Sequence, residues 1–257
     1  MAHVLLNHLL QHLEQGHLPE SQCGFRAERG TVDMIFAARQ LQEKCQEQHS
    51  DLFVTFVDLT KAFDTVSRDG LWKIMEKFGC PSKFITIVRQ FHDGMLAVIK
   101  VKVTVIRDFL FADDCALNAG TEQKMQHELD CFSRACDNFG LTISTKKTEV
   151  MYQPGPGQPY QEPHIMVKGQ ELQAVDSFTY LGSTLSRAVN IGAEVINRIA
   201  KASSAFGRLR ENVWERTGLS LTTKLKVYRA VVLTTLLYAC ETWTSTADMP
   251  NSSTTFT

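Results

Sequence analysis

The stretch FLFADDCAL, residues 109–117, places two adjacent carboxylates, Asp113 and Asp114, inside an apolar run. Burying charged carboxylates among apolar side chains is costly unless cations hold them. Neighbouring residues on a strand point to opposite faces, so both acids can approach one site only at a tight turn. The pattern therefore predicts a hairpin with the two acids at its tip, a shape suited to binding Mg²⁺.

A second apolar run supplies a third carboxylate. Residues 52–58, LFVTFVD, are rich in β-branched and aromatic side chains and end in Asp58, which predicts a strand with an acid at its end. A two-metal site for phosphoryl transfer needs several oxygen ligands because Mg²⁺ prefers octahedral oxygen coordination. We expect Asp58, Asp113 and Asp114 to form such a site. The alternative is that Asp58 caps a turn and that the other two acids form an ordinary hairpin tip.

Five blocks resemble, in order, the motifs of reverse transcriptases from non-LTR (LINE-type) retrotransposons. Residues 56–66, FVDLTKAFDTV, resemble motif A, and FADD at 111–114 resembles motif C. The remaining blocks are QCGFR and RGT at 22–26 and 29–31 before motif A, GLTI and KKT at 140–143 and 146–148 as motif D, and FTYLG at 178–182 as motif E.

The resemblance implies an RNA-directed DNA polymerase, a nucleotidyltransferase that uses two Mg²⁺ ions, an RNA template, a DNA primer and deoxynucleotides. Its implied catalytic residues are Asp58, Asp113, Asp114 and Lys147; Asp58 and Asp113 would bind the metal, and Lys147 would lie near the leaving pyrophosphate. Phe63 would lie under the incoming sugar and exclude a ribose 2′-hydroxyl. The implied substrate-binding residues are Phe63, Phe111, Ala112, Arg26, Arg29 and the primer-gripping Tyr180, Leu181 and Gly182.

One motif of the family has no counterpart. Motif B, a Gln-Gly turn and a long helix that support the template and the incoming base, should lie between motifs A and C. Here a helical pattern over residues 67–91 leaves only residues 92–108 before the hairpin. The first strands of the fingers and the endonuclease of such elements also lack counterparts. We expect a truncated, internally deleted reverse transcriptase with impaired catalysis; the alternative is a non-catalytic nucleic-acid-binding remnant or a co-opted protein.

The order of the expected elements indicates an α+β fold, a polymerase palm made of an antiparallel sheet with helices on one face. Residues 1–50 are expected to form partial fingers, residues 51–189 the palm and residues 190–243 a helical, thumb-like region. Residues 244–257 contain eight Ser or Thr among fourteen positions and are expected to form a disordered tail.

Basic residues concentrate in the thumb-like region although the net charge of the chain is only −1. Residues 192–229 contain eight Lys or Arg and three Glu, a balance that suits phosphate binding. A helical stripe is expected to pack inward, and residues 222–243 should form a second, mostly buried helix. The stripe comprises Val195, Ile199, Ala202, Phe206, Leu209 and Val213. It leaves Arg198, Lys201 and Arg208 to contact nucleic acid or, in the alternative, only solvent.

The cysteines and the apolar runs bear on the compartment. Seven cysteines are scattered without a C-x-x-C pair, which favours a reducing compartment. The longest apolar stretch, residues 230–239, is too short to cross a bilayer. We expect an intracellular protein of the nucleus or cytoplasm without a membrane partner.

Overall fold

The computed structural model describes residues 2–13, 16, 22–26, 29–92, 109–111 and 113–243. The chain divides into two compact units, residues 1–189 and residues 190–257, and each is described by itself. Mixed helices and largely antiparallel strands agree with the expected α+β class.

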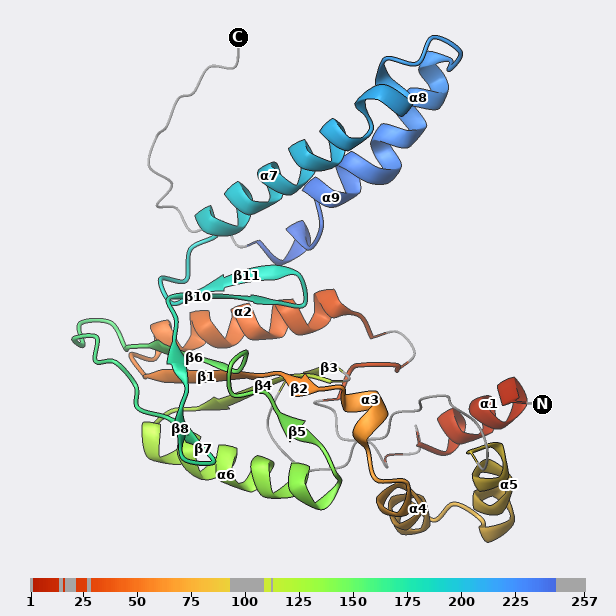
Figure 1. Cartoon of the computed structure of the whole chain (residues 1–257). Helices are drawn as coiled ribbons and strands as arrows, with labels where there is room; N and C mark the ends of the chain where they lie inside the picture. The colour runs from red at the N-terminus through yellow and green to blue at the C-terminus, as the bar shows by residue number, and fades with distance from the viewer. Residues whose placement is uncertain are drawn as a thin grey trace. The chain divides into compact units, whose positions relative to one another are not determined.

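Unit 1 is built around a five-stranded sheet in the order β3-β4-β1-β6-β9 (Figure 1). The pairs within it are antiparallel except β6 with β9. Its strands are β1 (Leu52–Val57), β3 (Phe109–Phe111), β4 (Asp114–Ala119), β6 (Glu149–Gln153) and β9 (Gln173–Ala174). Three smaller pairs join β2 (Leu59–Thr60) to β5 (Thr142–Ile143), β7 (Met166–Val167) to β8 (Gln170–Glu171), and β10 (Ser177–Tyr180) to β11 (Ser183–Ser186). Its helices are α1 (Ala2–Leu13), α2 (Thr31–Glu47), α3 (Ala62–Thr65), α4 (Arg68–Lys77), α5 (Ser82–His92) and α6 (Glu122–Asn138).

Both faces of the sheet are covered, which corrects the expectation of helices on one face only. All six residues of β1 are buried, so alternate side chains enter two different cores. Phe53 and Val57 pack with Met125 and Leu129 of α6 in one core. Members of the other core include Leu52, Val54 and Phe56 of β1, Met34 and Ala38 of α2, and Tyr180 and Leu185 of the β10–β11 hairpin. Figure 1 shows α2 and this hairpin on the opposite side of the sheet from α6.

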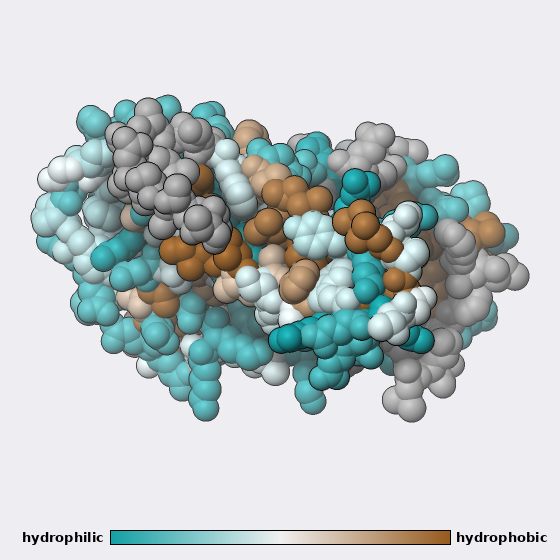
Figure 2. All heavy atoms as spheres, turned by 90° about the horizontal axis from the view of Figure 1, so that it is seen from above, coloured by the Kyte–Doolittle hydropathy of each residue, from teal (hydrophilic) through white to brown (hydrophobic). Residues whose placement is uncertain are grey.

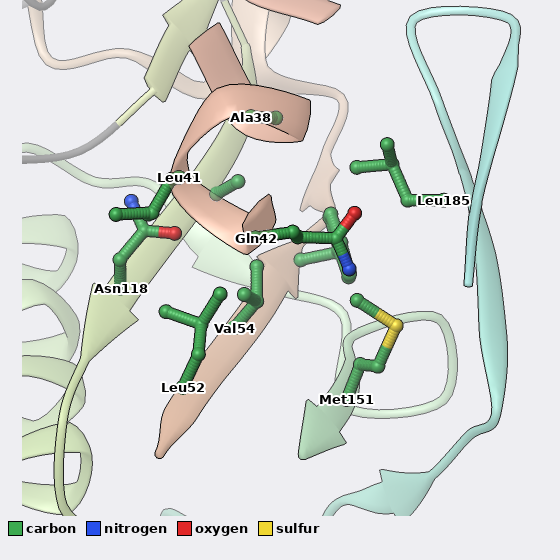
Figure 3. A pocket seen from close by; sticks show the side chains of 10 residues that line it. Ala38, Leu41, Gln42, Leu52, Val54, Asn118, Met151 and Leu185 are labelled. Atoms are coloured by element: carbon green, nitrogen blue, oxygen red, sulfur yellow. The ribbon is translucent and has the colours of Figure 1, made fainter. Parts of the chain in front are cut away.

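Two buried glutamines join α2 to the sheet. The Gln42 side-chain amide donates to Gln153 Oε1 at 3.2 Å and to the carbonyl of Ser186 at 3.0 Å, and Gln153 returns a bond to the carbonyl of Gln42 at 3.0 Å. Figure 3 shows Gln42 beside a small, mostly apolar cavity whose lining includes Leu52 and Leu185. The network satisfies polar groups that would otherwise be costly to bury at this junction.

Helices α4 and α5 form a third core with part of α1. Leu71, Trp72 and Met75 of α4 pack with Ile85 of α5, and Leu9 of α1 lies against them. The side chain of Ser67 caps α4 by accepting a hydrogen bond from the N–H of Gly70 at 3.2 Å. This helical cluster follows the connection from β1 and is separate from the two cores of the sheet.

Unit 2 is helical. It comprises α7 (Gly192–Arg208), η1 (Arg210–Trp214), α8 (Leu221–Val227), η2 (Tyr228–Leu233), α9 (Thr234–Leu236) and η3 (Cys240–Thr242). Among the described residues, no helix is long and apolar enough to cross a membrane.

The buried face of α7 differs from the expected stripe. Two of the stripe residues, Ile199 and Phe206, are 52% and 44% exposed, whereas Glu194 and Arg198 are buried. Ala202 and Ala205 complete the buried face, and their small side chains allow close approach. The stripe prediction was therefore right for Ala202 but wrong for Ile199 and Phe206, and it missed the burial of Glu194 and Arg198.

The second helical segment is also more exposed than expected. Among residues 222–243, the buried side chains are Val232, Ala239 and Thr242, so the expectation of a mostly buried helix was wrong. Leu225 and Leu237 remain 47% and 45% exposed. Figure 2 shows hydrophobic residues at the surface seen from above, between more hydrophilic regions.

Candidate active site

The end of β1 and the start of β4 bring the predicted acids to one end of the sheet. Val57 at the end of β1 pairs with Cys115 of β4, and continuing this register by one residue places Asp58 opposite Asp114. In the hairpin of β3 and β4, Phe111 pairs with Asp114, so Asp113 belongs to the connecting turn. The predicted hairpin with acids at its tip is therefore present, and the ladder places Asp114 rather than Asp113 opposite Asp58.

The backbone of Asp58 is held on both sides by the turn after β5. The N–H of Asp58 donates to Thr148 Oγ1 at 3.2 Å, and the carbonyl of Asp58 accepts from the N–H of Ser144 at 2.9 Å. Thr148 is fully buried, and its own N–H closes the turn by donating to the carbonyl of Ser144 at 2.8 Å. Sequence reasoning assigned no role to Ser144 or Thr148. The threonine that directly precedes the largely buried strand at 149–153 could have indicated such a role.

Lys147 lies on the same turn and faces the carboxylate of Asp58. Its Nζ is 3.6 Å from Asp58 Oδ2, and the two side chains are 71% and 40% exposed. An exposed pair at this distance contributes little stability, on the order of 0–1 kcal/mol. The pair nevertheless brings together two expected catalytic residues from different motifs and places a cationic group beside Asp58.

A magnesium site at these carboxylates would be one in which the protein supplies few of the ligands. Among the described residues, no group of three or more His, Cys, Asp or Glu side chains is placed to hold a metal ion. Magnesium is usually bound through one or two carboxylates, with water and substrate phosphates completing the shell. At the paired strand ends, the carboxylate of Asp58 is 40% exposed and could meet an ion from solvent.

The segment after Asp58 turns sharply toward α3. Lys61 has a φ of 47°, in the left-handed region that lysine rarely adopts, and it begins α3. Gly140, at a φ of 71°, fits closely against this segment because a Cβ there would lie 2.9 Å from the carbonyl of Thr65. Phe63 belongs to α3, but its side chain lies outside the described part of the structure.

The predicted primer-gripping segment forms a tight hairpin. Tyr180 pairs with Ser183, and the two connecting residues, Leu181 and Gly182, both have positive φ angles of 47° and 84°. Such turns match the twist of the flanking strands. Tyr180 itself is only 2% exposed and packs near Phe56, so its side chain serves the core rather than a surface contact.

The environment of Tyr180 connects this hairpin to the acids. Burial raises the pKa of Tyr180 far above its ordinary value, and the nearby Cys115 and Asp114 raise that pKa further. Tyr180 is therefore neutral, and its side chain is part of the core beside Cys115 and Asp114 at the start of β4. Among the three predicted primer contacts, Leu181 and Gly182 form the turn itself.

The remaining predicted substrate-binding residues are Arg26, Arg29, Phe111 and Ala112. Arg26 Nη1 donates to the carbonyl of Gln22 at 3.5 Å, and Arg29 is an exposed residue just before α2. Phe111 lies on β3, but its side chain and the whole of Ala112 are outside the described residues. The same holds for residues 93–108, where motif B was judged missing, and for the predicted tail at 244–257.

The predicted nucleic-acid contacts of unit 2 differ in exposure. Arg208 is exposed and Lys201 is half-buried. Arg198 is 5% exposed, and its Nε donates to Glu194 Oε1 at 2.6 Å. Its guanidinium also lies 4.6 Å from the ring centre of Tyr238. Arg198 is thus held by internal contacts, whereas the side chains of Lys201 and Arg208 keep some or all of their surface in solvent.

Comparison with known proteins supports the predicted family. Residues 1–105 match the family model described as reverse transcriptase (RNA-dependent DNA polymerase). The RNA-directed DNA polymerase from mobile element jockey of Drosophila melanogaster is 22% identical over 291 aligned residues, covering 95% of this chain and 31% of that protein. A putative uncharacterized transposon-derived protein of Caenorhabditis elegans is 32% identical over 142 residues, covering 52% of this chain and 47% of that protein.

The extent of these matches is also informative. The chain spans 31% and 47% of the lengths of the two relatives. The alignment with the Drosophila protein runs over 291 positions, more than the 257 residues of the chain, so it opens gaps in this chain. The family-model match ends at residue 105, before β3 begins at Phe109.

Proposed function

We propose that unit 1 contains the palm of an RNA-directed DNA polymerase and that Asp58 and Asp113 are its magnesium ligands. The match of residues 1–105 to the reverse transcriptase family model and the similarity to the RNA-directed DNA polymerase from mobile element jockey support this proposal. The observation that carries the proposal is the register of β1 and β4, which places Asp58 opposite Asp114 and so beside the turn that holds Asp113. Deoxynucleotides, a DNA primer and an RNA template are the proposed substrates.

In this proposal the residues of the chain orient the metal-binding carboxylate and place a positive charge near the phosphates. Bound Mg²⁺ would neutralise phosphate charge and orient the primer oxygen for in-line attack on the α-phosphate. Ser144 and Thr148 fix the backbone of Asp58, so its carboxylate can be oriented without a side-chain anchor. Lys147, beside Asp58, would meet the negative charge of the leaving pyrophosphate once a nucleotide is present.

We also propose that this polymerase is catalytically impaired. The segment between α5 and β3 has no motif B sequence to support the template and the incoming base, and the gaps in the Drosophila alignment are consistent with a loss of residues. Small misplacements of reacting groups cost on the order of a hundredfold in rate. Intact acids alone would therefore leave little extension.

A primer-extension assay tests this function directly. The purified chain, incubated with Mg²⁺, deoxynucleotides and a DNA primer on an RNA template, should extend the primer weakly or not at all. Asp113→Asn is the control, because it removes an anionic ligand with almost no change in volume. Strong extension that disappears in this variant would contradict the impairment and establish an active enzyme. In that case Phe63→Val should admit ribonucleotides. Extension that survives Asp113→Asn would come from a contaminating polymerase.

A second candidate function is nucleic-acid binding without catalysis. Several basic residues of unit 2 remain at the surface, including Arg208, Arg216, Lys226 and Arg229. Lysine and arginine act on phosphates without reading bases, so RNA or DNA should bind weakly, without sequence preference and with steep salt dependence. Replacing Lys201 and Arg208 by Gln should weaken binding. Unchanged affinity would exclude this surface.

A further inference from the structure

The two acids of the β3–β4 turn share one peptide unit. The carbonyl of Asp113 and the N–H of Asp114 belong to the same planar amide, whose orientation is set by the ψ angle of Asp113 and the φ angle of Asp114. The same two angles set how the Cα–Cβ bonds of the two acids point relative to each other. Asp114 pairs with Phe111 in the ladder, whereas Asp113 lies in the turn itself. A contact that holds this amide therefore helps to orient both carboxylates.

The side chain of Cys115 makes a contact of this kind. Its Sγ donates a hydrogen bond to the carbonyl of Asp113, with sulfur and oxygen 3.4 Å apart. The bond reaches back over Asp114, so it acts on the amide between the two acids. A thiol is a weak donor, but here it is directed at the one backbone unit that the acids have in common.

The position of this sulfur is fixed by the sheet and by the core. Cys115 lies on β4, the strand between β1 and β3 (Figure 1), and it pairs with Val57 of β1 and with Leu110 of β3. Its side chain is 2% exposed and belongs to the core that also contains Val57 and Leu117. Because these neighbours hold the donor, the hydrogen bond restrains the turn.

The alternative is that Cys115 only fills space in the core, since a buried cysteine can behave as a small apolar side chain. The two roles differ in one property. A side chain that fills space can be replaced by an apolar group of similar shape, whereas a donor can be replaced only by another donor.

We propose that Cys115 is a positioning residue of the acid pair: its thiol holds the amide between Asp113 and Asp114 and so sets the direction of their carboxylates. Cys115 acts through this amide and not on a substrate. Its effect on metal binding rests on the proposed function, in which Asp113 is a magnesium ligand. Because hydrogen bonds from sulfur are weak, the bond favours the oriented turn by a factor of about two to five.

The test compares two matched pairs of variants of the full chain. Cys115→Thr and Cys115→Val have nearly the same shape and differ in a hydroxyl donor. Cys115→Ser and Cys115→Ala repeat the comparison with smaller side chains, in case the larger pair disturbs the core. Exchange of the Asp114 N–H with solvent, followed by NMR, reports opening of the shared amide.

Exchange at Asp114 should be about two- to fivefold faster in the Val variant than in the Thr variant, and faster by a similar factor in Ala than in Ser. The same Thr and Val pair at Cys136, a buried cysteine of α6 in the same core, is the control. It should show no difference at Asp114. Equal exchange at Asp114 within both pairs at position 115 would overturn the proposal.

A second measurement follows the metal. Mn²⁺ replaces Mg²⁺ as a paramagnetic probe, and free Mn²⁺ is measured by electron paramagnetic resonance. Its dissociation constant should rise about two- to fivefold in the variants that lack a donor and stay near the wild-type value in Thr and Ser.

The Mn²⁺ titration separates failure of this inference from failure of the proposed function. If Asp58→Asn and Asp113→Asn weaken Mn²⁺ binding but the Val and Ala variants do not, the role of Cys115 toward the metal is refuted. If the two Asn variants bind Mn²⁺ as the wild type does, the proposed metal site is wrong, and the exchange at Asp114 still decides whether the thiol holds the amide.

Discussion

The ion pair between Glu194 and Arg198 should be the most sensitive contact of unit 2. Its two side chains are 0% and 6% exposed, and Arg198 Nε lies 2.6 Å from Glu194 Oε1. Arg198→Met removes the charge while keeping an unbranched apolar stem, so the buried carboxylate of Glu194 loses its arginine. Breaking a buried pair in this way costs about 3–5 kcal/mol, which corresponds to an increase of about 10²- to 10⁴-fold in the opening equilibrium of α7.

The chain contains a matched control for this prediction. Arg210 Nε lies 2.5 Å from Glu215 Oε1, almost the same separation, but these side chains are 72% and 54% exposed. Solvent screens an exposed pair, so Arg210→Met should cost less than about 1 kcal/mol. The two substitutions change the same residue type, so a difference between them measures burial of the pair.

Amide hydrogen exchange of the full chain, followed by mass spectrometry, gives the required local measurement. Peptides from α7 should exchange much faster in Arg198→Met and nearly as in wild type in Arg210→Met. The double change Glu194→Leu/Arg198→Met should recover most of the protection, because an apolar pair needs no compensating charge. Equal exchange of α7 in the two single variants would refute the reasoning, since it would mean that Glu194 remains solvated in the folded protein.

Two further predictions concern unit 1. Thr148→Val should leave the partly buried N–H of Asp58 without its acceptor, so amide exchange at Asp58 should accelerate at a cost of about 1–3 kcal/mol. Thr148→Ser should retain protection, and equal protection in both variants would contradict the role of the Thr148 hydroxyl. The hydrogen bond to Glu171 raises the pKa of His164, so this contact stabilises the loop fully below the ordinary histidine pKa near 6.5 and loses that effect as pH rises through the higher folded-state pKa. An NMR titration should give a midpoint above 6.5 for His164 that falls toward 6.5 in Glu171→Gln, and a midpoint unaffected by that change would argue against the pairing.

The edge of the sheet that carries the acids could be predicted from local sequence. Asp113 and Asp114 interrupt an apolar run, and only a turn lets such acids escape burial, so the hairpin of β3 and β4 followed from the pattern alone. Asp58 ends a strand of buried residues for the same reason. What the pattern did not contain was the register, which depends on long-range pairing of Val57 with Cys115 and places Asp114 opposite Asp58.

The rotation of α7 could not be predicted from its periodicity. The helical period identified Ile199 and Phe206 as one apolar face, but a period does not state whether that face is covered. Glu194 and Arg198 are four residues apart, so they neutralise each other on one side of the helix and can be buried together. Sequence reasoning treated Arg198 as a surface cation because it considered each charge separately.

The two ends of β1 show how one strand can hold carboxylates for different purposes. Asp51, just before the strand, has its carboxylate fixed by the N–H of Gly155, which donates to Oδ1 at 2.8 Å. Asp58, just after the strand, is held instead through its backbone, and its carboxylate faces the exposed Lys147 at 3.6 Å. A carboxylate that already accepts a main-chain hydrogen bond would lose that bond on binding an ion, whereas one fixed by its main chain can exchange a weakly held lysine for a metal at little cost. The proposed metal ligand is therefore distinguished from the structural acid by what holds it in place, and this contrast predicts that Asp51→Asn disturbs folding more than Asp58→Asn, which thermal unfolding of the two variants measures.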